Sequence, residues 1–121
     1  MSKTIMIVDD SLSMRQVLGS TLQSAGFAIV EGVDGVDALD KLAKNPVDLL
    51  ITDLNMPNMD GIQLITKARA LPSCKTTPIL MLTTETDATK KQAGRAAGAT
   101  GWLVKPFQPD RVLEAVGKAL A

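Results

Sequence analysis

Acidic, hydroxyl and basic side chains follow four of the short apolar runs in this sequence. Asp9 and Asp10 come directly after the first run, and Asp53 follows the third. Thr83 follows the fourth run and Lys105 the fifth. If the runs are parallel strands of one sheet, their carboxyl ends meet at one edge, where open α/β folds bind their ligands. The sequence alone does not fix the strand order, so the side chains converge only if the first, third, fourth and fifth strands are neighbours. The sequence therefore predicts three carboxylates, a hydroxyl and an ammonium group close together.

These charges require either that one carboxyl group stays protonated or that a further cation lies among them. Two carboxylates about 4 Å apart repel by roughly 4 kcal/mol at an effective dielectric constant of 20, and Lys105 supplies only one positive charge. Because the donors are oxygens, we expect a hard divalent ion. Mg²⁺ suits a site of few carboxylates that is completed by water and phosphate. Phosphoryl transfer is the chemistry that such a set supports, since it depends mainly on positioning and charge neutralisation.

Each side chain has a role in this interpretation. Asp53 is the nucleophile, because a carboxylate can attack phosphorus and form an acyl phosphate. Asp9 and Asp10 hold the metal, while Lys105 pairs with the phosphoryl oxygens. Thr83 donates a hydrogen bond to one of those oxygens. The sequence contains neither GxGxxG nor GxxxxGK[ST], so nucleotide binding has no support.

The composition narrows the function classes. The 121 residues suit one domain over 1–121, and 13 basic residues offset 13 acidic ones, which argues against nucleic acid as a partner. The absence of histidine excludes serine-type triads and a phosphohistidine donor. Cys74 is the only cysteine, consistent with a reducing compartment. The longest aliphatic run, 79–82, is far below the roughly 18 residues of a membrane helix, so we expect a cytoplasmic protein without membrane contact.

Strand and helix patterns alternate five times, which predicts a (βα)5 doubly wound α/β fold. The apolar runs expected to be strands buried on both faces are 4–8, 27–30, 47–52, 78–82 and 100–104. Asp34 and Asp60 suit helix N-caps, and Pro109 suits a first helical turn. The residues expected on the inward helix faces are Met14, Val17, Leu18, Thr21, Leu22 and Ala25; Leu39, Leu42 and Ala43; Ile62, Leu64, Ile65 and Ala68; and Val112, Leu113, Val116 and Leu120.

The fourth predicted helix, over 84–99, differs from the others. It contains no large apolar residue, and Gly94 inside it costs about 1 kcal/mol relative to alanine. One interpretation is tight packing of small residues against the sheet. The other is that this helix is the least firmly held element and shifts when the protein switches.

The sequence resembles the receiver domain of two-component response regulators, in particular the single-domain CheY-like chemotaxis regulators. The resemblance covers essentially the whole chain. It implies a flavodoxin-like fold with a five-stranded parallel sheet in the order 2-1-3-4-5 and helices on both faces, an order for which CheY is itself a known example. The motifs that carry the resemblance are Ile7-Val8-Asp9-Asp10, Met14-Arg15, Asp53-Leu54-Asn55-Met56-Pro57, Met59-Asp60-Gly61, Leu82-Thr83-Thr84 and Gly101-Trp102-Leu103-Val104-Lys105-Pro106-Phe107.

The resemblance also implies a set of roles at the predicted site. Asp53 would accept a phosphoryl group from the phosphohistidine of a CheA-like sensor histidine kinase. The Mg²⁺ ligands would be the side chains of Asp10 and Asp53 and the backbone carbonyl of Asn55, with Asp9 acting through water. Thr83 would be a switch hydroxyl that moves toward the phosphoryl group. The chain would assist its own phosphorylation and dephosphorylation and would not be an enzyme with an external substrate.

Three further positions follow from the resemblance. Asn55 and Glu85 match variable positions that influence how fast the phosphate is lost. Trp102 stands where the family usually has the tyrosine or phenylalanine of an aromatic switch. Indole is bulkier and lacks a phenol hydroxyl, so two interpretations stay open: a rotamer switch, or an aromatic side chain that fills a groove beside the fourth helix.

The chain ends at Ala121, directly after the last predicted helix. We therefore expect output by docking on the fourth helix, fifth strand and fifth helix. We also expect a monomer. The expected partner is the flagellar motor switch protein. The alternative is a phosphorelay intermediate or phosphate sink that passes phosphate to a histidine phosphotransfer protein. A phosphatase is a further expected partner.

Other functions fit the pattern less well. A Mg²⁺-dependent aspartyl-phosphate phosphatase of the haloacid-dehalogenase type needs DxD after the first strand, where this chain has adjacent aspartates. A flavodoxin-like electron carrier has little support, because the chain has three aromatic residues and no hydroxyl-rich phosphate loop after the first strand. An EF-hand at 53–55 fails, since Pro57 and Asn58 stand where an oxygen ligand and a glycine are needed.

Overall fold

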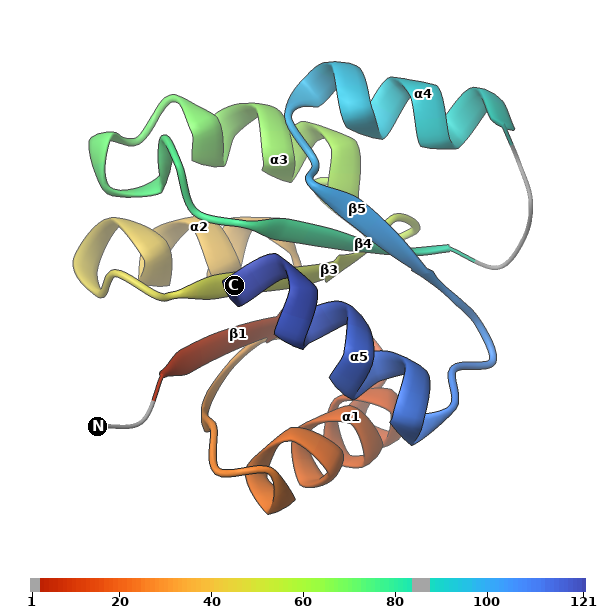
Figure 1. Cartoon of the computed structure of the whole chain (residues 1–121). Helices are drawn as coiled ribbons and strands as arrows, with labels where there is room; N and C mark the ends of the chain where they lie inside the picture. Colours follow the sequence, from red (N-terminus) through yellow and green to blue (C-terminus); the bar gives the residue numbers. More distant parts are fainter. Residues whose placement is uncertain (1–2, 84–87) are drawn as a thin grey trace.

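A computed structural model describes residues 3–83 and 88–121 of the chain (Figure 1). Strands and helices alternate along it, as the sequence predicts. In chain order the elements are β1 (Thr4–Val8), α1 (Leu12–Ser24), β2 (Ala28–Gly32), α2 (Gly35–Lys44), β3 (Leu49–Asp53), α3 (Gly61–Arg69), the short 3-10 helix η1 (Pro72–Cys74), β4 (Ile79–Thr83), α4 (Ala88–Ala97), β5 (Gly101–Val104) and α5 (Pro109–Leu120).

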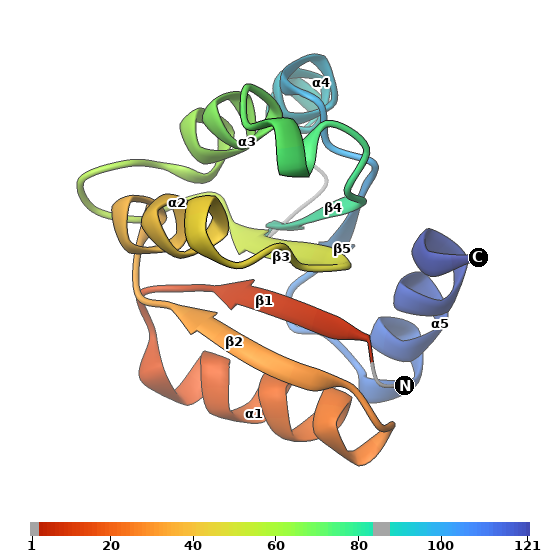
Figure 2. The same ribbon diagram turned by 90° about the vertical axis from the view of Figure 1, so that its left-hand side faces the viewer.

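The five strands form one parallel sheet in the order β2-β1-β3-β4-β5, which confirms the expected fold. Helices α1 and α5 cover one face of the sheet, and α2, α3 and α4 cover the other (Figures 1 and 2). Each face has its own buried apolar cluster. Within the described residues, no helix combines the length and the apolar character that crossing a membrane requires.

The strands differ in burial according to their place in the sheet. The central strands β1, β3 and β4 are buried almost throughout. The prediction of burial on both faces is wrong for β2 and β5, which are partly exposed. These two strands form the edges of the sheet. An edge strand has a neighbour on one side only, so its side chains are covered less completely.

Side-chain caps begin two of the helices where the sequence predicts them. Asp34 accepts a hydrogen bond from the amide of Asp37 at the start of α2, and Asp60 forms a capping box with Gln63 at the start of α3. Each cap satisfies amides that have no partner inside the helix. The chain therefore turns from the carboxyl edge of the sheet into a helix at a defined residue.

Three of the predicted inward positions are wrong. Ala25 is exposed, because it is the C-cap residue that follows α1. Val17 is 56% exposed, because the face of α1 against the sheet is made by Arg15, Leu18 and Leu22. Ala43 is exposed on α2, where Leu42 and its neighbour one turn earlier, Ala38, are buried instead.

Helix α4 packs on the sheet through its glycine. Gly94 is buried on α4, and a Cβ atom added there would overlap the Sδ and Cε atoms of Met81 on β4. At its C-terminal end, the Gly98 carbonyl accepts hydrogen bonds from Nε and Nη2 of Arg69, at 3.1 and 2.8 Å. Close small-residue packing is thus observed at Gly94, while the interpretation that α4 is the least firmly held element stays a prediction. The first four residues of the predicted helix lie outside the described residues.

Candidate functional site

Three carboxylates gather at the carboxyl edge of the sheet. One oxygen each from Asp9, Asp10 and Asp53 lies within 4.8 Å of the others. Strands β1 and β3 are neighbours whose register pairs Val8 with Thr52, so the aspartates follow at adjacent strand ends. The fold therefore brings together carboxylates that are more than 40 residues apart in the sequence.

Lys105 follows the edge strand β5, which is separated from β3 by β4, and its side chain extends to this group. Its Nζ atom lies 3.2 Å from Oδ1 of Asp53 and 3.6 Å from Oδ2 of Asp9. The Lys105 amide donates to the carbonyl of Thr83 at 2.7 Å, which fixes the backbone where β5 ends beside β4. A cis peptide bond joins Lys105 to Pro106. One ammonium group thus faces two of the three carboxylates.

Asp9 is the most deeply buried of the three carboxylates, with 1% of its surface exposed. Its Oδ1 atom accepts the Ser11 amide at 2.9 Å. Its Oδ2 atom is a buried side-chain oxygen that has no hydrogen-bond partner in the described part of the chain. Burial raises the pKa of Asp9, the nearby Asp53 charge raises it further, and the Ser11 amide and Lys105 act against this rise.

These observations fit a divalent cation. Three carboxylates lie close together, of which Asp10 is exposed and Asp9 has a buried oxygen without a hydrogen-bond partner among residues 3–83 and 88–121. Within the same residues, Lys105 is the lysine that forms ion pairs with this group. At 4.8 Å, the upper limit of the distances between these oxygens, a pair of carboxylates repels by about 3.5 kcal/mol at an effective dielectric constant of 20. A hard cation relieves this repulsion, and oxygen donors are the set that Mg²⁺ prefers.

The position of Asp53 depends on the turn that follows it. The Leu54 amide donates to Oδ1 of Asp53 at 2.8 Å. Gly61 at the start of α3 packs against the same segment, where an added Cβ atom would overlap the Asp53 carbonyl oxygen and lie 2.9 Å from Cα of Leu54. Only a glycine allows α3 to begin this close to the end of β3.

The comparisons with known proteins agree with this geometry. The family model for the response regulator receiver domain matches residues 5–117. The chain belongs to the response regulator receiver family. A chemotaxis protein CheY homolog from Campylobacter jejuni is 40% identical over 112 residues, which cover 91% of this chain and 86% of that protein. The structure of chemotaxis protein CheY4 from Vibrio cholerae is 47% identical, has a TM-score of 0.96, and is matched over 99% of this chain and 100% of that chain.

The family match favours the CheY-like receiver interpretation over the phosphatase and electron-carrier alternatives. The remaining predicted site residues of this receiver lie at or near the same edge. Thr83 is buried at the end of β4, and Asn55 is exposed two residues after Asp53. Glu85 lies outside the described residues.

Trp102 lies on β5 and packs against α4. Its ring faces two cations of that helix, with the Lys91 ammonium 4.9 Å and the Arg95 guanidinium 5.0 Å from the ring centre. Part of the ring also packs against the apolar cluster under α2, α3 and α4. In this receiver the aromatic side chain therefore occupies the groove beside α4.

The sequence interpretation gave no role to Arg15, although it noted the residue in a motif. Arg15 is buried on α1 and donates to the carbonyl oxygen of Asp9 at 2.6 Å. The signal that could have found it is a charged residue on the helix face that Leu18 and Leu22 share. Such a residue needs a buried partner.

Proposed function

We propose that this chain is the phosphoacceptor of a chemotaxis two-component system and that Asp53 is the residue phosphorylated. The observation that carries the proposal is the place of the Asp53 carboxylate, 3.2 Å from the Lys105 ammonium group and grouped with Asp9 and Asp10. The similarity to CheY proteins named for chemotaxis supports the pathway.

Mg²⁺ is the cofactor that we assign to the acidic group. Its ligands are the side chains of Asp10 and Asp53 and the backbone carbonyl of Asn55, while buried Asp9 acts through water. The exposure of Asp10 agrees with an ion that keeps several waters. When bound, the ion neutralises the carboxylates and the incoming phosphoryl group.

Phosphoryl transfer then uses the two oxygens of Asp53 differently. Oδ1 is already engaged by the Leu54 amide and Lys105, so we assign the attack to Oδ2. Oδ2 forms a bond to phosphorus while the P–N bond of the kinase's phosphohistidine breaks. The leaving imidazole nitrogen keeps the electron pair and takes up a proton. Lys105 and the Thr83 hydroxyl then pair with the phosphoryl oxygens.

Dephosphorylation removes the negative charge that the phosphoryl group added at this edge. Water attacks phosphorus, the Asp53 carboxylate leaves with its electron pair, and inorganic phosphate is released. Asn55 and Glu85 are the positions where we expect side chains to set the rate of this step. The chain acts on its own phosphoryl group and does not turn over an external substrate.

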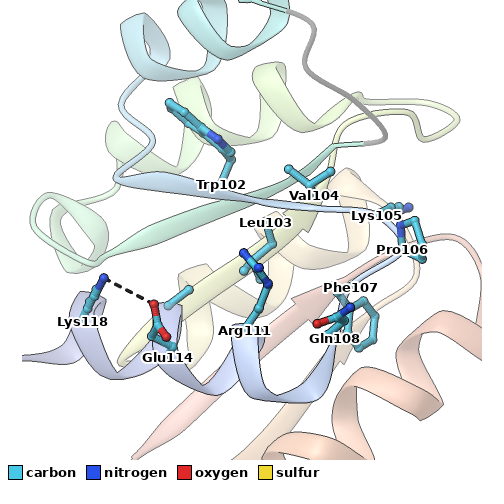
Figure 3. Close-up of a pocket in the computed structure, with 11 residues that line it drawn as sticks. Trp102, Leu103, Val104, Lys105, Pro106, Phe107, Gln108, Arg111, Glu114 and Lys118 are labelled. Atoms are coloured by element: carbon cyan, nitrogen blue, oxygen red, sulfur yellow. Dashed lines mark hydrogen bonds and ion pairs between the residues drawn. The ribbon is translucent and has the colours of Figure 1, made fainter.

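The output surface in this proposal is formed by α4, β5 and α5. A hollow of about 520 Å³ lies there, lined by the residues from Trp102 to Gln108 and by one side of α5 (Figure 3). Trp102 lies on β5, and Lys105 directly follows the end of that strand (Figure 3). A phosphoryl group adds roughly one negative charge beside Lys105, and the change reaches the hollow along β5.

We assign the partners from the transfer chemistry and from the similarity to CheY proteins named for chemotaxis. A CheA-like histidine kinase supplies the phosphoryl group to a monomeric, cytoplasmic receiver domain over 1–121, and a phosphatase removes it. The phosphorylated form binds the flagellar motor switch protein. The alternative partner is a histidine phosphotransfer protein. A pull-down of each candidate with phosphorylated and unphosphorylated protein distinguishes them, because only differential affinity transmits a signal.

The chemistry is tested by incubating the protein with Mg²⁺ and acetyl phosphate and measuring its intact mass. We expect a gain of one phosphoryl group that requires Mg²⁺ and is absent from Asp53→Asn. A gain that persists in Asp53→Asn, or that is unaffected by chelation of Mg²⁺, contradicts the proposal.

The role of Trp102 is tested by fluorescence, since it is the only tryptophan. If the ring takes part in the switch, its emission changes when beryllofluoride binds with Mg²⁺, because the two cations over the ring move relative to it. An unchanged spectrum, with binding shown by calorimetry, assigns Trp102 to groove filling alone.

A further inference from the structure

Arg15 is a cation buried beside the acidic group that does not face its carboxylates. Only 10% of its side chain is exposed. Nη1 donates to the backbone carbonyl of Asp9 at 2.6 Å, and Nε donates to Oε1 of Glu31 at 3.0 Å. The guanidinium group therefore joins α1 to the ends of β1 and β2.

The carbonyl that Arg15 holds belongs to the peptide group between Asp9 and Asp10. The same short segment is fixed at two further points. The Asp9 amide donates to the Gly32 carbonyl at 3.2 Å, and the Ser11 amide donates to the Asp9 side chain at 2.9 Å. Rotation of this peptide would change the direction in which Asp10 leaves the backbone, and the charge-assisted bond from Arg15 opposes that rotation.

The burial of the Arg15 cation near the proposed Mg²⁺ site is energetically unfavourable by itself. Desolvation of an arginine is costly, and the one carboxylate bonded to it, Glu31, is 49% exposed. A positive charge at this place also repels a divalent ion in the acidic group. What Arg15 supplies in return is a fixed orientation of the backbone that carries two of the three carboxylates.

We infer that Arg15 is a positioning residue that sets the Asp9–Asp10 peptide for Mg²⁺ binding. The inference rests on the proposed Mg²⁺ site. The positioning role and the charge of Arg15 predict opposite changes in Mg²⁺ affinity when Arg15 is removed. If Arg15 acted only through its charge, its removal would strengthen Mg²⁺ binding, because one repulsion would be lost. If Arg15 positions the peptide, its removal weakens Mg²⁺ binding.

The chain offers a matched control. Arg69 also uses its guanidinium to bind backbone carbonyls, at 2.6 Å to Cys74 and 2.8 Å to Gly98, on the face of the sheet opposite α1. Arg69→Met removes a comparable set of bonds without touching the carboxylates. Arg15→Met removes both the charge and the bonds, and Arg15→Lys keeps the charge but loses the planar fork.

The experiment measures Mg²⁺ affinity of the unphosphorylated full chain by titration calorimetry for the parent and the three variants. We expect about tenfold weaker binding for Arg15→Met, as for other groups that orient metal ligands. The Mg²⁺ affinity of Arg15→Lys should lie between those of Arg15→Met and the parent. The affinity of Arg69→Met should equal that of the parent. If Arg15→Met does not fold, Arg15→Lys decides, since any loss at constant charge comes from geometry.

Unchanged or tighter binding in the Arg15 variants overturns the inference while leaving the proposed site in place. An equal loss in Arg69→Met also overturns it, because general destabilisation would then explain the effect. Failure of the parent to bind Mg²⁺ refutes the proposed metal site itself, and the inference with it. Amide chemical shifts of Asp10 and Ser11 without metal give a second readout, and we expect them to change in Arg15→Met and not in Arg69→Met.

Discussion

Replacement of Gly94 by alanine measures how α4 is attached to the sheet. Alanine improves helix propensity by about 1 kcal/mol. The added Cβ atom would overlap Sδ and Cε of Met81, which is fully buried on β4. Such overpacking costs about 1–3 kcal/mol. Taking about 2 kcal/mol for that cost, Gly94→Ala lowers the free energy of unfolding by about 1 kcal/mol.

Gly117 on α5 provides the matched control. It also lies inside a helix, but nothing lies within 4 Å of a Cβ atom added there. Gly117→Ala should therefore stabilise the protein by about 1 kcal/mol. The same substitution therefore changes the free energy of unfolding in opposite directions in the two helices. The expected changes in melting temperature are about 4 °C, down for Gly94→Ala and up for Gly117→Ala, for a domain of this size.

Urea denaturation of both single variants and of Met81→Ala with and without Gly94→Ala provides the assay. Met81→Ala alone is strongly destabilising, because it leaves a cavity. In that background, however, Gly94→Ala should become stabilising by about 1 kcal/mol, since the overlap is gone. If Gly94→Ala stabilises the parent as much as Gly117→Ala does, α4 is not packed through its glycine and the reasoning is refuted.

Three further outcomes are expected. Burial raises the pKa of Asp9, so the stability that this group contributes is present below its unfolded pKa and is lost as pH rises through its folded pKa. Asp9→Asn should therefore be more stable than the parent at pH 7 in EDTA, with a difference that shrinks toward pH 4; urea denaturation at both values checks this. Gly61→Ala should abolish phosphorylation by acetyl phosphate and lower the melting temperature, because the new methyl group displaces the Asp53 backbone. Amide hydrogen exchange should be faster over 88–97 than in β3, because Gly94 is the only buried residue among those of α4 whose burial is described; equal protection contradicts this.

The regular parts of the fold could be predicted because they depend on local pattern. Helix caps at Asp34 and Asp60 are short-range signals, and both were predicted correctly. The exposure of Val17 was not predictable in the same way. A helical stripe shows which residues share a face, but the neighbouring helix and the sheet decide how far around that face the cover extends.

The site was predictable to a similar degree. Residues at the carboxyl ends of parallel strands lie at one edge of the sheet. The grouping of Asp9, Asp10, Asp53 and Lys105 also requires the strand order β2-β1-β3-β4-β5, which the family resemblance implied and the strand pattern alone did not fix. The contact of Arg15 with the Asp9 carbonyl is different. It depends on how α1 lies over the end of β1, which no spacing in the sequence specifies.

The central claim is that Asp53 itself receives the phosphoryl group, and mapping the modified residue tests it most directly. Protein treated with Mg²⁺ and acetyl phosphate is reduced with borohydride, which converts an aspartyl phosphate to homoserine, and its peptides are sequenced by mass spectrometry. We predict homoserine at residue 53 and unmodified aspartate at residues 9 and 10. Homoserine at residue 9 or 10, or phosphate on a hydroxyl side chain with residue 53 intact, would contradict the account.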